Sequence, residues 1–224
     1  MFYNCTSLTS APELPATTLA SGCYYRMFTK CTSLTQAPKL PATSLTSYCY
    51  NTMLAGCTSL TSAPELPATS LDSNCYEAMF ESCTSLTTAP GLPATTLASN
   101  CYNGMFYGCT SLTSAPELPA TTLASKCYYG MFYGCTSLTT APELPATTLP
   151  TGLAGGCYSS MFIGCTSLKR IKMNISSGSW GTYMFNGCTS LELVDMTGST
   201  GVPTLSNVNS FSSTNDTYKI VVPD

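Results

Sequence analysis

Cysteine has the widest chemical repertoire of the residues in this chain, which contains fourteen cysteines among 224 residues. Eight of them open an invariant Cys-Thr-Ser-Leu motif, and six precede a tyrosine. The first set is Cys5, Cys31, Cys57, Cys83, Cys109, Cys135, Cys165 and Cys188, and the second is Cys23, Cys49, Cys75, Cys101, Cys127 and Cys157. No C-x-x-C pair occurs, which disfavours a redox or metal site. Buried free thiols that fill small apolar spaces are the expectation, with disulfides between neighbouring repeats as the alternative.

The other chemical groups point away from catalysis. The chain has no histidine, so imidazole-dependent triads, zinc sites and acid–base schemes are excluded. One charged position recurs through the chain as Glu13, Lys39, Glu65, Gly91, Glu117 and Glu143. A single carboxylate per repeat is a weak calcium or catalytic signal. The sequence therefore predicts a protein that is not an enzyme, with no metal and no cofactor.

Composition removes further classes of protein. Eight Lys and Arg against eleven Asp and Glu give a net charge of -3, so no basic face is available for nucleic acid. Apolar residues reach 44%, which is too many for a disordered chain. No run approaches the ~18 uninterrupted apolar residues of a membrane span. No signal segment opens the sequence.

An internal repeat organises the chain. Met-Phe, once Met-Leu, opens eight units, which begin at Met1, Met27, Met53, Met79, Met105, Met131, Met161 and Met184. Most units are 26 residues long, the sixth has 30 and the seventh has 23. A period in this range predicts a solenoid in which each unit completes its core by stacking on its neighbours. At roughly 4.8 Å per stacked strand, eight units predict a rod or arc about 40 Å long.

Each unit is expected to contain one short strand and one short helix. Leu8, Ala11 and Leu14 are apolar residues separated by polar ones, as on a strand with one buried face. Cys23, Met27 and Cys31 then lie four residues apart, as on one face of a helix. The predicted fold is an α/β solenoid of about eight coils.

The last two units differ from the rest. They read TSLKRIKM and TSLELVDM, with alternating apolar residues and no proline. Stacking in register would place Lys169 beside Glu192 and Lys172 beside Asp195. Two such ion pairs would contribute about 0.2–1 kcal/mol each.

The expected boundaries are a solenoid over 1–196 and an irregular end cap over 197–224. The cap ends in a strand signal at Tyr218–Val222. Since no polar cap precedes the first repeat, the chain is expected to be truncated at both ends.

Two surfaces are candidates for binding. The strand face carries regular hydroxyl and charged side chains, and the edge around the Met-Phe and Cys-Tyr pairs varies between units and carries tyrosines. The strand-face residues are Thr9, Ser10, Glu13, Thr35, Gln36, Lys39, Thr61, Ser62, Glu65, Thr87, Thr88, Thr113, Ser114, Glu117, Thr139, Thr140, Glu143, Lys169, Arg170 and Lys172. The variable-edge residues are Tyr25, Tyr48, Tyr107, Tyr129 and Tyr133. Hydroxyl columns also satisfy backbone groups in solenoids, so a structural role remains the alternative.

The unit C-x-x-L-x-x-A-P-x-L-P followed by M-F-x-x-C resembles a BspA-like leucine-rich repeat. Cys5, Leu8, Ala11, Leu14 and Pro15 occupy the motif's places, followed by Met27 and Phe28. The resemblance covers about residues 1–196. Six units depart from it by one extra residue before the second strand leucine, and Ala11 replaces a larger aliphatic residue. The resemblance implies a right-handed curved solenoid with strands on the concave face.

The resemblance also implies a function. It suggests a non-enzymatic binding module of a bacterial cell-surface or secreted protein, monomeric as isolated, which contacts protein or glycan on a host or neighbouring cell. Similar repeats in phage and prophage tails support the alternative of a receptor-binding or structural tail part. A rigid spacer without a ligand is the remaining alternative.

Overall fold

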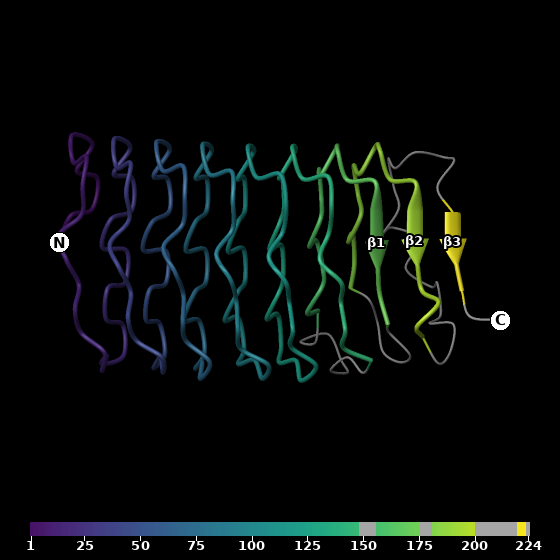
Figure 1. Ribbon diagram of the computed structural model, residues 1–224, viewed down its shortest axis with the longest axis horizontal. Coiled ribbons are helices and arrows are strands. Elements are labelled where there is room, and N and C mark those ends of the chain that lie inside the picture. Colours follow the sequence, from purple (N-terminus) through teal and green to yellow (C-terminus); the bar gives the residue numbers. More distant parts are fainter. Residues whose placement is uncertain (148–155, 175–180, 200–218, 223–224) are drawn as a thin grey trace.

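The computed structural model describes residues 1–147, 156–174, 181–199 and 219–222. The chain forms a stack of similar coils that follow one another along the long axis (Figure 1). Parallel bridges join residues one repeat apart, including Ser10 to Gln36, Ser62 to Thr88 and Thr88 to Ser114. Equivalent residues of successive coils therefore lie side by side, and the solenoid expected from the repeat is the observed architecture.

Three strands stand at the C-terminal end of the stack. They are β1 (Arg170–Lys172), β2 (Leu193–Asp195) and β3 (Lys219–Val221). All pair in parallel in the order β1-β2-β3, with Ile171 opposite Val194 and Val194 opposite Ile220 (Figure 1). Ile171 and Val194 are buried at the middle of β1 and β2, which follows from the alternation of apolar and polar residues in these units.

Earlier coils form isolated bridges at the same place instead of strands. Each of them carries the sequence A-P-x-L-P there, and proline has no N–H to donate to a ladder. The register gives a second reason why the proline coils form no continuous strand. Thr140 pairs with Arg170, thirty residues on, whereas Leu144 pairs with Met173, twenty-nine on. The proline coils thus hold one extra residue between these two points, which interrupts the pairing.

The expected helix in each unit is wrong: the described residues contain no helix. The segment is a run of overlapping turns, in which the N–H groups of Met105 and Tyr107 donate to the carbonyls three residues earlier at 3.2 and 3.0 Å. The N–H groups between them donate to the next coil, as from Phe106 to the carbonyl of Met131 at 2.9 Å. Every second backbone amide of this segment therefore forms a hydrogen bond to the next coil.

Left-handed backbone positions explain why this segment is not helical. Where the fourth coil passes into the fifth, Asn100, Gly104 and Gly108 have φ angles of +55°, +60° and +69°. A right-handed helix cannot pass through such residues, and glycine and asparagine accept them most readily. Two overlapping turns advance the chain by four residues, so they place Cys101, Met105 and Cys109 on one side just as a helix would. The spacing of four was correct, but it did not identify the element.

The core consists of straight rows of identical side chains. The Cys-Thr-Ser-Leu leucines from Leu34 onward are fully buried, as are the Met-Phe pairs of the central coils. Phenylalanine rings stack face to face between neighbouring coils, for example Phe80 on Phe106 with centroids 5.6 Å apart. Because each row continues through several coils, each coil completes the apolar surface of the next.

Candidate binding surface

The strand face presents every side chain that the sequence assigned to it. All twenty of those residues are exposed. The threonine hydroxyls also have a structural role, because Thr35, Thr87, Thr113 and Thr139 each donate to a threonine carbonyl of the preceding coil at 3.2–3.4 Å. The hydroxyl column therefore ties coils together, while its exposed side stays available for contact.

The charged column extends further than the sequence indicated. The pairing of Leu144 with Met173 places Glu143 beside Lys172, and the β1–β2 register places Lys172 opposite Asp195. The column, from here on the charge column, is thus Glu13, Lys39, Glu65, Gly91, Glu117, Glu143, Lys172 and Asp195. The sequence predicted that Lys172 lies beside Asp195, but it missed the step from Glu143 to Lys172, because the thirty-residue unit shifts the register by one residue.

The ion pairs differ from those expected. Lys172 Nζ lies 3.0 Å from Glu143 Oε1, with each side chain 48% exposed, instead of pairing with Asp195. The hydrogen bond from Lys172, helped by one from Asn174 at 3.1 Å, lowers the pKa of Glu143. Asp195 accepts hydrogen bonds from the N–H and hydroxyl of Thr197, which lower its pKa. Within the described part of the chain, Lys169 and Glu192 form no ion pair, although their backbones are bonded.

A line of depressions follows the A-P-x-L-P segments along the strand face. Four depressions of about 430 to 530 Å³ are lined by the alanines, prolines, leucines and charge-column residues of neighbouring coils. This line is called the proline groove. Its signal in the sequence is the return of A-P-x-L-P in six units.

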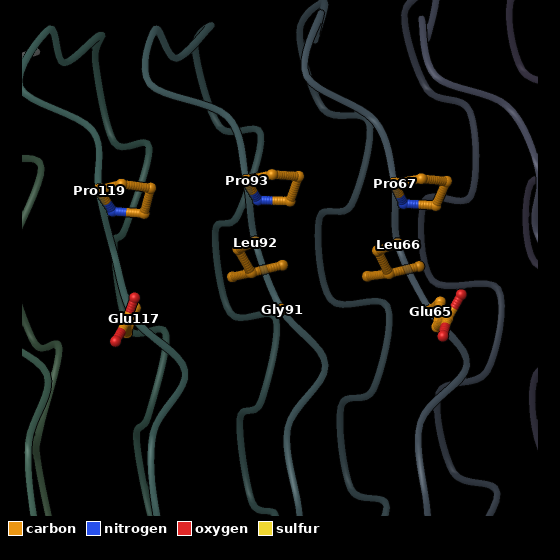
Figure 2. A pocket seen from close by; sticks show the side chains of 8 residues that line it. All are labelled: Glu65, Leu66, Pro67, Gly91, Leu92, Pro93, Glu117 and Pro119. Atoms are coloured by element: carbon orange, nitrogen blue, oxygen red, sulfur yellow. The ribbon is translucent and has the colours of Figure 1, made fainter.

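One of these depressions lies over Gly91 (Figure 2). Its volume is about 530 Å³, and it spans three coils. Figure 2 shows Pro67, Pro93 and Pro119 in one row, with Glu65 and Glu117 on the coils at either side of Gly91. The arrangement combines apolar walls with two carboxylates.

The variable edge lies on the overlapping turns. Tyr25, Tyr48, Tyr107 and Tyr129 are exposed, and Tyr133 is half-buried. Tyr107 stacks on Tyr133 with centroids 4.5 Å apart. These tyrosines are therefore a set of separate aromatic contacts and not one continuous patch.

Cations lie over Tyr3 and over two of the edge tyrosines, Tyr25 and Tyr129. The guanidinium carbon of Arg26 is 5.4 Å from the centroid of the Tyr3 ring and 5.9 Å from that of Tyr25. Lys126 Nζ lies 6.0 Å from the Tyr129 ring. These cation–π contacts already occupy one side of the aromatic groups.

From Cys31 onward, the thiols of the Cys-Thr-Ser-Leu column are buried in the core. All fourteen cysteines are free, and twelve of them are buried. In the Cys-Thr-Ser-Leu column, the thiols of Cys57 and Cys109 donate to the carbonyls of Phe28 and Phe80 at 3.2 and 3.1 Å. Burial raises the pKa of Cys57 to about 12. Since the thiolate is the reactive form, these thiols are held in their unreactive state.

A buried tyrosine row runs beside the second cysteine column. The rings of Tyr50, Tyr76, Tyr102, Tyr128 and Tyr158 stack with centroids 5.8 to 5.9 Å apart. Each of these side chains is 1% exposed. The hydroxyls of Tyr50, Tyr76, Tyr102 and Tyr158 have no hydrogen-bond partner in the described structure. The row supplies stacking and apolar burial, while its hydroxyls oppose burial.

The comparisons with known proteins agree with the repeat. The family model of the BspA type leucine rich repeat region matches residues 1–113, 73–192 and 102–224, with six copies. The chain therefore belongs to the BspA-type leucine-rich repeat family. No curated protein matches the sequence.

Among solved structures, the chain is similar to a leucine-rich repeat protein from Bacteroides ovatus. The two are 16% identical, with a TM-score of 0.30, and the match covers 100% of this chain and 86% of the other. The family assignment rests on the family model, because this likeness is too distant to carry an argument.

Two kinds of feature are absent from the described residues. None of their segments is a helix long and apolar enough to cross a membrane. They also contain no group of three or more histidine, cysteine or acidic residues placed to hold a metal ion.

Proposed function

We propose that this chain is a non-enzymatic binding module of a bacterial cell-surface or secreted protein, and that the strand face contacts protein or glycan on another cell. The observation that carries the proposal is the proline groove. It runs through consecutive coils, has apolar walls, and is bordered by exposed hydroxyl and charged side chains. Ligand sites combine these two kinds of surface.

Repetition supports a multivalent mode of binding. The same groove elements return at each coil, so an extended partner can make several equivalent contacts at once. Linked weak contacts raise the total affinity well above that of one contact. A rigid stack keeps the spacing between these contacts fixed, which reduces the conformational entropy lost on binding.

The state of the thiols supports a binding function over a catalytic one. The cysteines are the strongest potential nucleophiles of the chain, yet most are buried, and desolvation raises the pKa of those in the central coils. The cell-surface or secreted location rests on the family, whose members the sequence resembles.

A rigid spacer is the second candidate, and the threonine column favours it. Those hydroxyls donate to the neighbouring coil, so their regularity has a structural cause that needs no ligand.

Glycan and matrix-protein arrays, probed with the intact chain and two variants, test these functions. The strand-face variant carries Ser62→Arg and Ser114→Arg, and the matched edge variant carries Tyr107→Ser and Tyr129→Ser. We expect specific signals that fall at least tenfold in the strand-face variant and persist in the edge variant. Loss in the edge variant alone would assign binding to the variable edge. The spacer predicts no specific signal from any of the three proteins.

A further inference from the structure

One position of the charge column has no side chain. The column alternates acids with lysines at two places: Lys39 stands between Glu13 and Glu65, and Lys172 stands between Glu143 and Asp195. Gly91 occupies the same position in the fourth coil, between Glu65 and Glu117. The column therefore repeats an acid–cation–acid order twice and omits the cation once.

The lysines show how the groove accommodates a cation. Lys39 lines one depression together with Glu13 and the next together with Glu65. Lys172 Nζ approaches Glu143 to 3.0 Å. In both places an ammonium group lies on the strand face with carboxylates in the adjacent coils, where opposite charges stabilise one another.

Neither backbone nor packing requires glycine at position 91. Its φ angle lies outside the left-handed region, and an added Cβ would meet no atom within 4 Å. The consequence of this glycine is therefore local: the space that a side chain would fill stays open. The depression at this point has a volume of about 530 Å³.

The charges beside this space are unbalanced. Glu65 has Lys39 on its other side, and Glu143 is paired with Lys172. Glu117 has Gly91 on one side and Glu143 on the other, so it is the one acid of the column with no lysine in an adjacent coil. Two coils separate Glu65 from Glu117, or roughly 10 Å along the stack, which leaves a midpoint about 5 Å from each coil.

We propose that the depression over Gly91 receives a lysine or arginine side chain of a protein partner, held between the carboxylates of Glu65 and Glu117. The prolines of the groove pack against the methylene groups of that side chain, and the ammonium or guanidinium group takes the place that Lys39 fills two coils away. The inference rests on the proposed function and names the partner chemistry at one point of the same face.

Small probes test the site directly. Nα-acetyl-lysine methylamide and Nα-acetyl-arginine methylamide are titrated at low ionic strength and followed by the NMR shifts of the Gly91 amide and the Glu65 and Glu117 carboxylate carbons. The uncharged Nα-acetyl-norleucine methylamide is the matched probe. We expect saturable shifts at these three residues with the cationic probes, and binding at least tenfold weaker with norleucine.

Three variants sharpen the test. Gly91→Lys supplies the missing cation and should abolish saturable binding over the fourth coil. Glu117→Gln should weaken binding at least threefold, whereas Glu13→Gln, at the far end of the column, should leave it unchanged. Lys39→Gly opens an equivalent gap between Glu13 and Glu65 and should create a second site. Thermal unfolding of each variant verifies that the fold is retained.

The proposal is overturned if norleucine binds as well as lysine, if the shifts lie away from Gly91, or if Gly91→Lys binds like the unaltered chain. No saturation by about 50 mM of either cationic probe also overturns it, because such a site would be too weak to select a partner. The array experiment is separate. If array binding depends on the strand face but neither cationic probe binds, the proposed function is supported and this inference is wrong.

Discussion

The proline coils and the two last coils build the same stack in different ways. In the first six units, A-P-x-L-P limits the strand face to isolated bridges, and a groove follows the prolines. In the last two units no proline is present, one residue fewer spans the face, and β1 and β2 pair continuously. Cohesion in the proline coils therefore depends on buried side-chain rows and on the turn amides that join neighbouring coils.

The difference shows how one repeat can serve two purposes. In the proline coils, the prolines and one extra residue reduce the backbone hydrogen bonds of the strand face and leave an apolar groove there. The buried side-chain rows compensate for these missing hydrogen bonds. The strand coils keep the ladder and lie outside the depressions described above. The proposed binding therefore belongs to the proline coils, whereas the paired sheet lies at the C-terminal end.

The largest expected effect is on the shared core. Leu112, in a proline coil, and Leu191, in a strand coil, are both fully buried. Replacing either by alanine should lower the free energy of unfolding by about 2–5 kcal/mol. Chemical denaturation measures both. A loss confined to Leu191→Ala would show that the proline coils are not held together by their side-chain rows.

Proline itself separates the two kinds of coil. Ile171→Pro, at the middle of β1, should cost about 3 kcal/mol or more, because proline constrains φ and cannot donate to a sheet. Pro119→Ala, at the exposed row of the groove, should stay within about 0.5 kcal/mol. Urea denaturation of the two variants makes the comparison. Equal effects would mean that the strand and proline coils are paired alike.

The tyrosine row yields a prediction of opposite sign. Tyr102 is 1% exposed and its hydroxyl has no partner in the described structure, whereas Gly181 takes the equivalent place in the last coil. Tyr102→Phe removes a desolvated hydroxyl and keeps the ring, so it should raise the free energy of unfolding by about 1 kcal/mol. Tyr48→Phe, at the exposed edge, is the control. Destabilisation by Tyr102→Phe would indicate that the hydroxyl is hydrogen-bonded.

The register of the last coils has a smaller consequence. Lys169 and Glu192 stand beside each other at the start of the two paired segments, and the N–H of Glu192 donates to the carbonyl of Lys169 at 2.7 Å. Lys169→Glu places two like charges there and should destabilise by about 0.2–1 kcal/mol. Thermal unfolding at low and high salt measures it, and stabilisation would contradict the register.

The ion pair at the junction of the two regions has the smallest effect. The hydrogen bond from Lys172 lowers the pKa of Glu143 below its ordinary value of 4.5. A carboxylate with a lowered pKa stabilises the fold above that ordinary value, and the stabilisation is lost as the pH falls through the folded-state pKa. Lys172→Met should therefore reduce stability slightly at pH 7 and have no effect once Glu143 is protonated. The free energy of unfolding is measured at pH 7 and at a pH low enough to protonate Glu143. An equal loss of stability at these two pH values would exclude this ion pair as its cause.

The sequence predicted the repeat, the stacking of equivalent residues and the family, because these follow from residues such as the Cys-Thr-Ser-Leu leucines that return without change. It did not predict the turn segment. The four-residue spacing fits a helix and overlapping turns equally well, so it could not distinguish the two. The glycines at Gly104 and Gly108, and again at Gly130 and Gly134, are the residues that disfavour a helix.

Charge pairing failed for a different reason. Lys172 was assigned to Asp195 because both lie in units of the same form. The extra residue of the preceding unit moves Glu143 level with Lys172, and this register is set by three-dimensional pairing. The sequence contains the residues that line the proline groove. It did not predict the groove, because a depression depends on how neighbouring coils pack against one another.

In the described coils, the turn segments donate alternate amides to the next coil. Scalar coupling across the hydrogen bond of the Phe106 amide, measured by NMR on the deuterated chain, tests this directly. The structure predicts coupling from Phe106 N to the carbonyl carbon of Met131, twenty-five residues later, across a bond of 2.9 Å. Coupling to the carbonyl carbon of Tyr102 instead would show a helix within one unit and would contradict the stack described above.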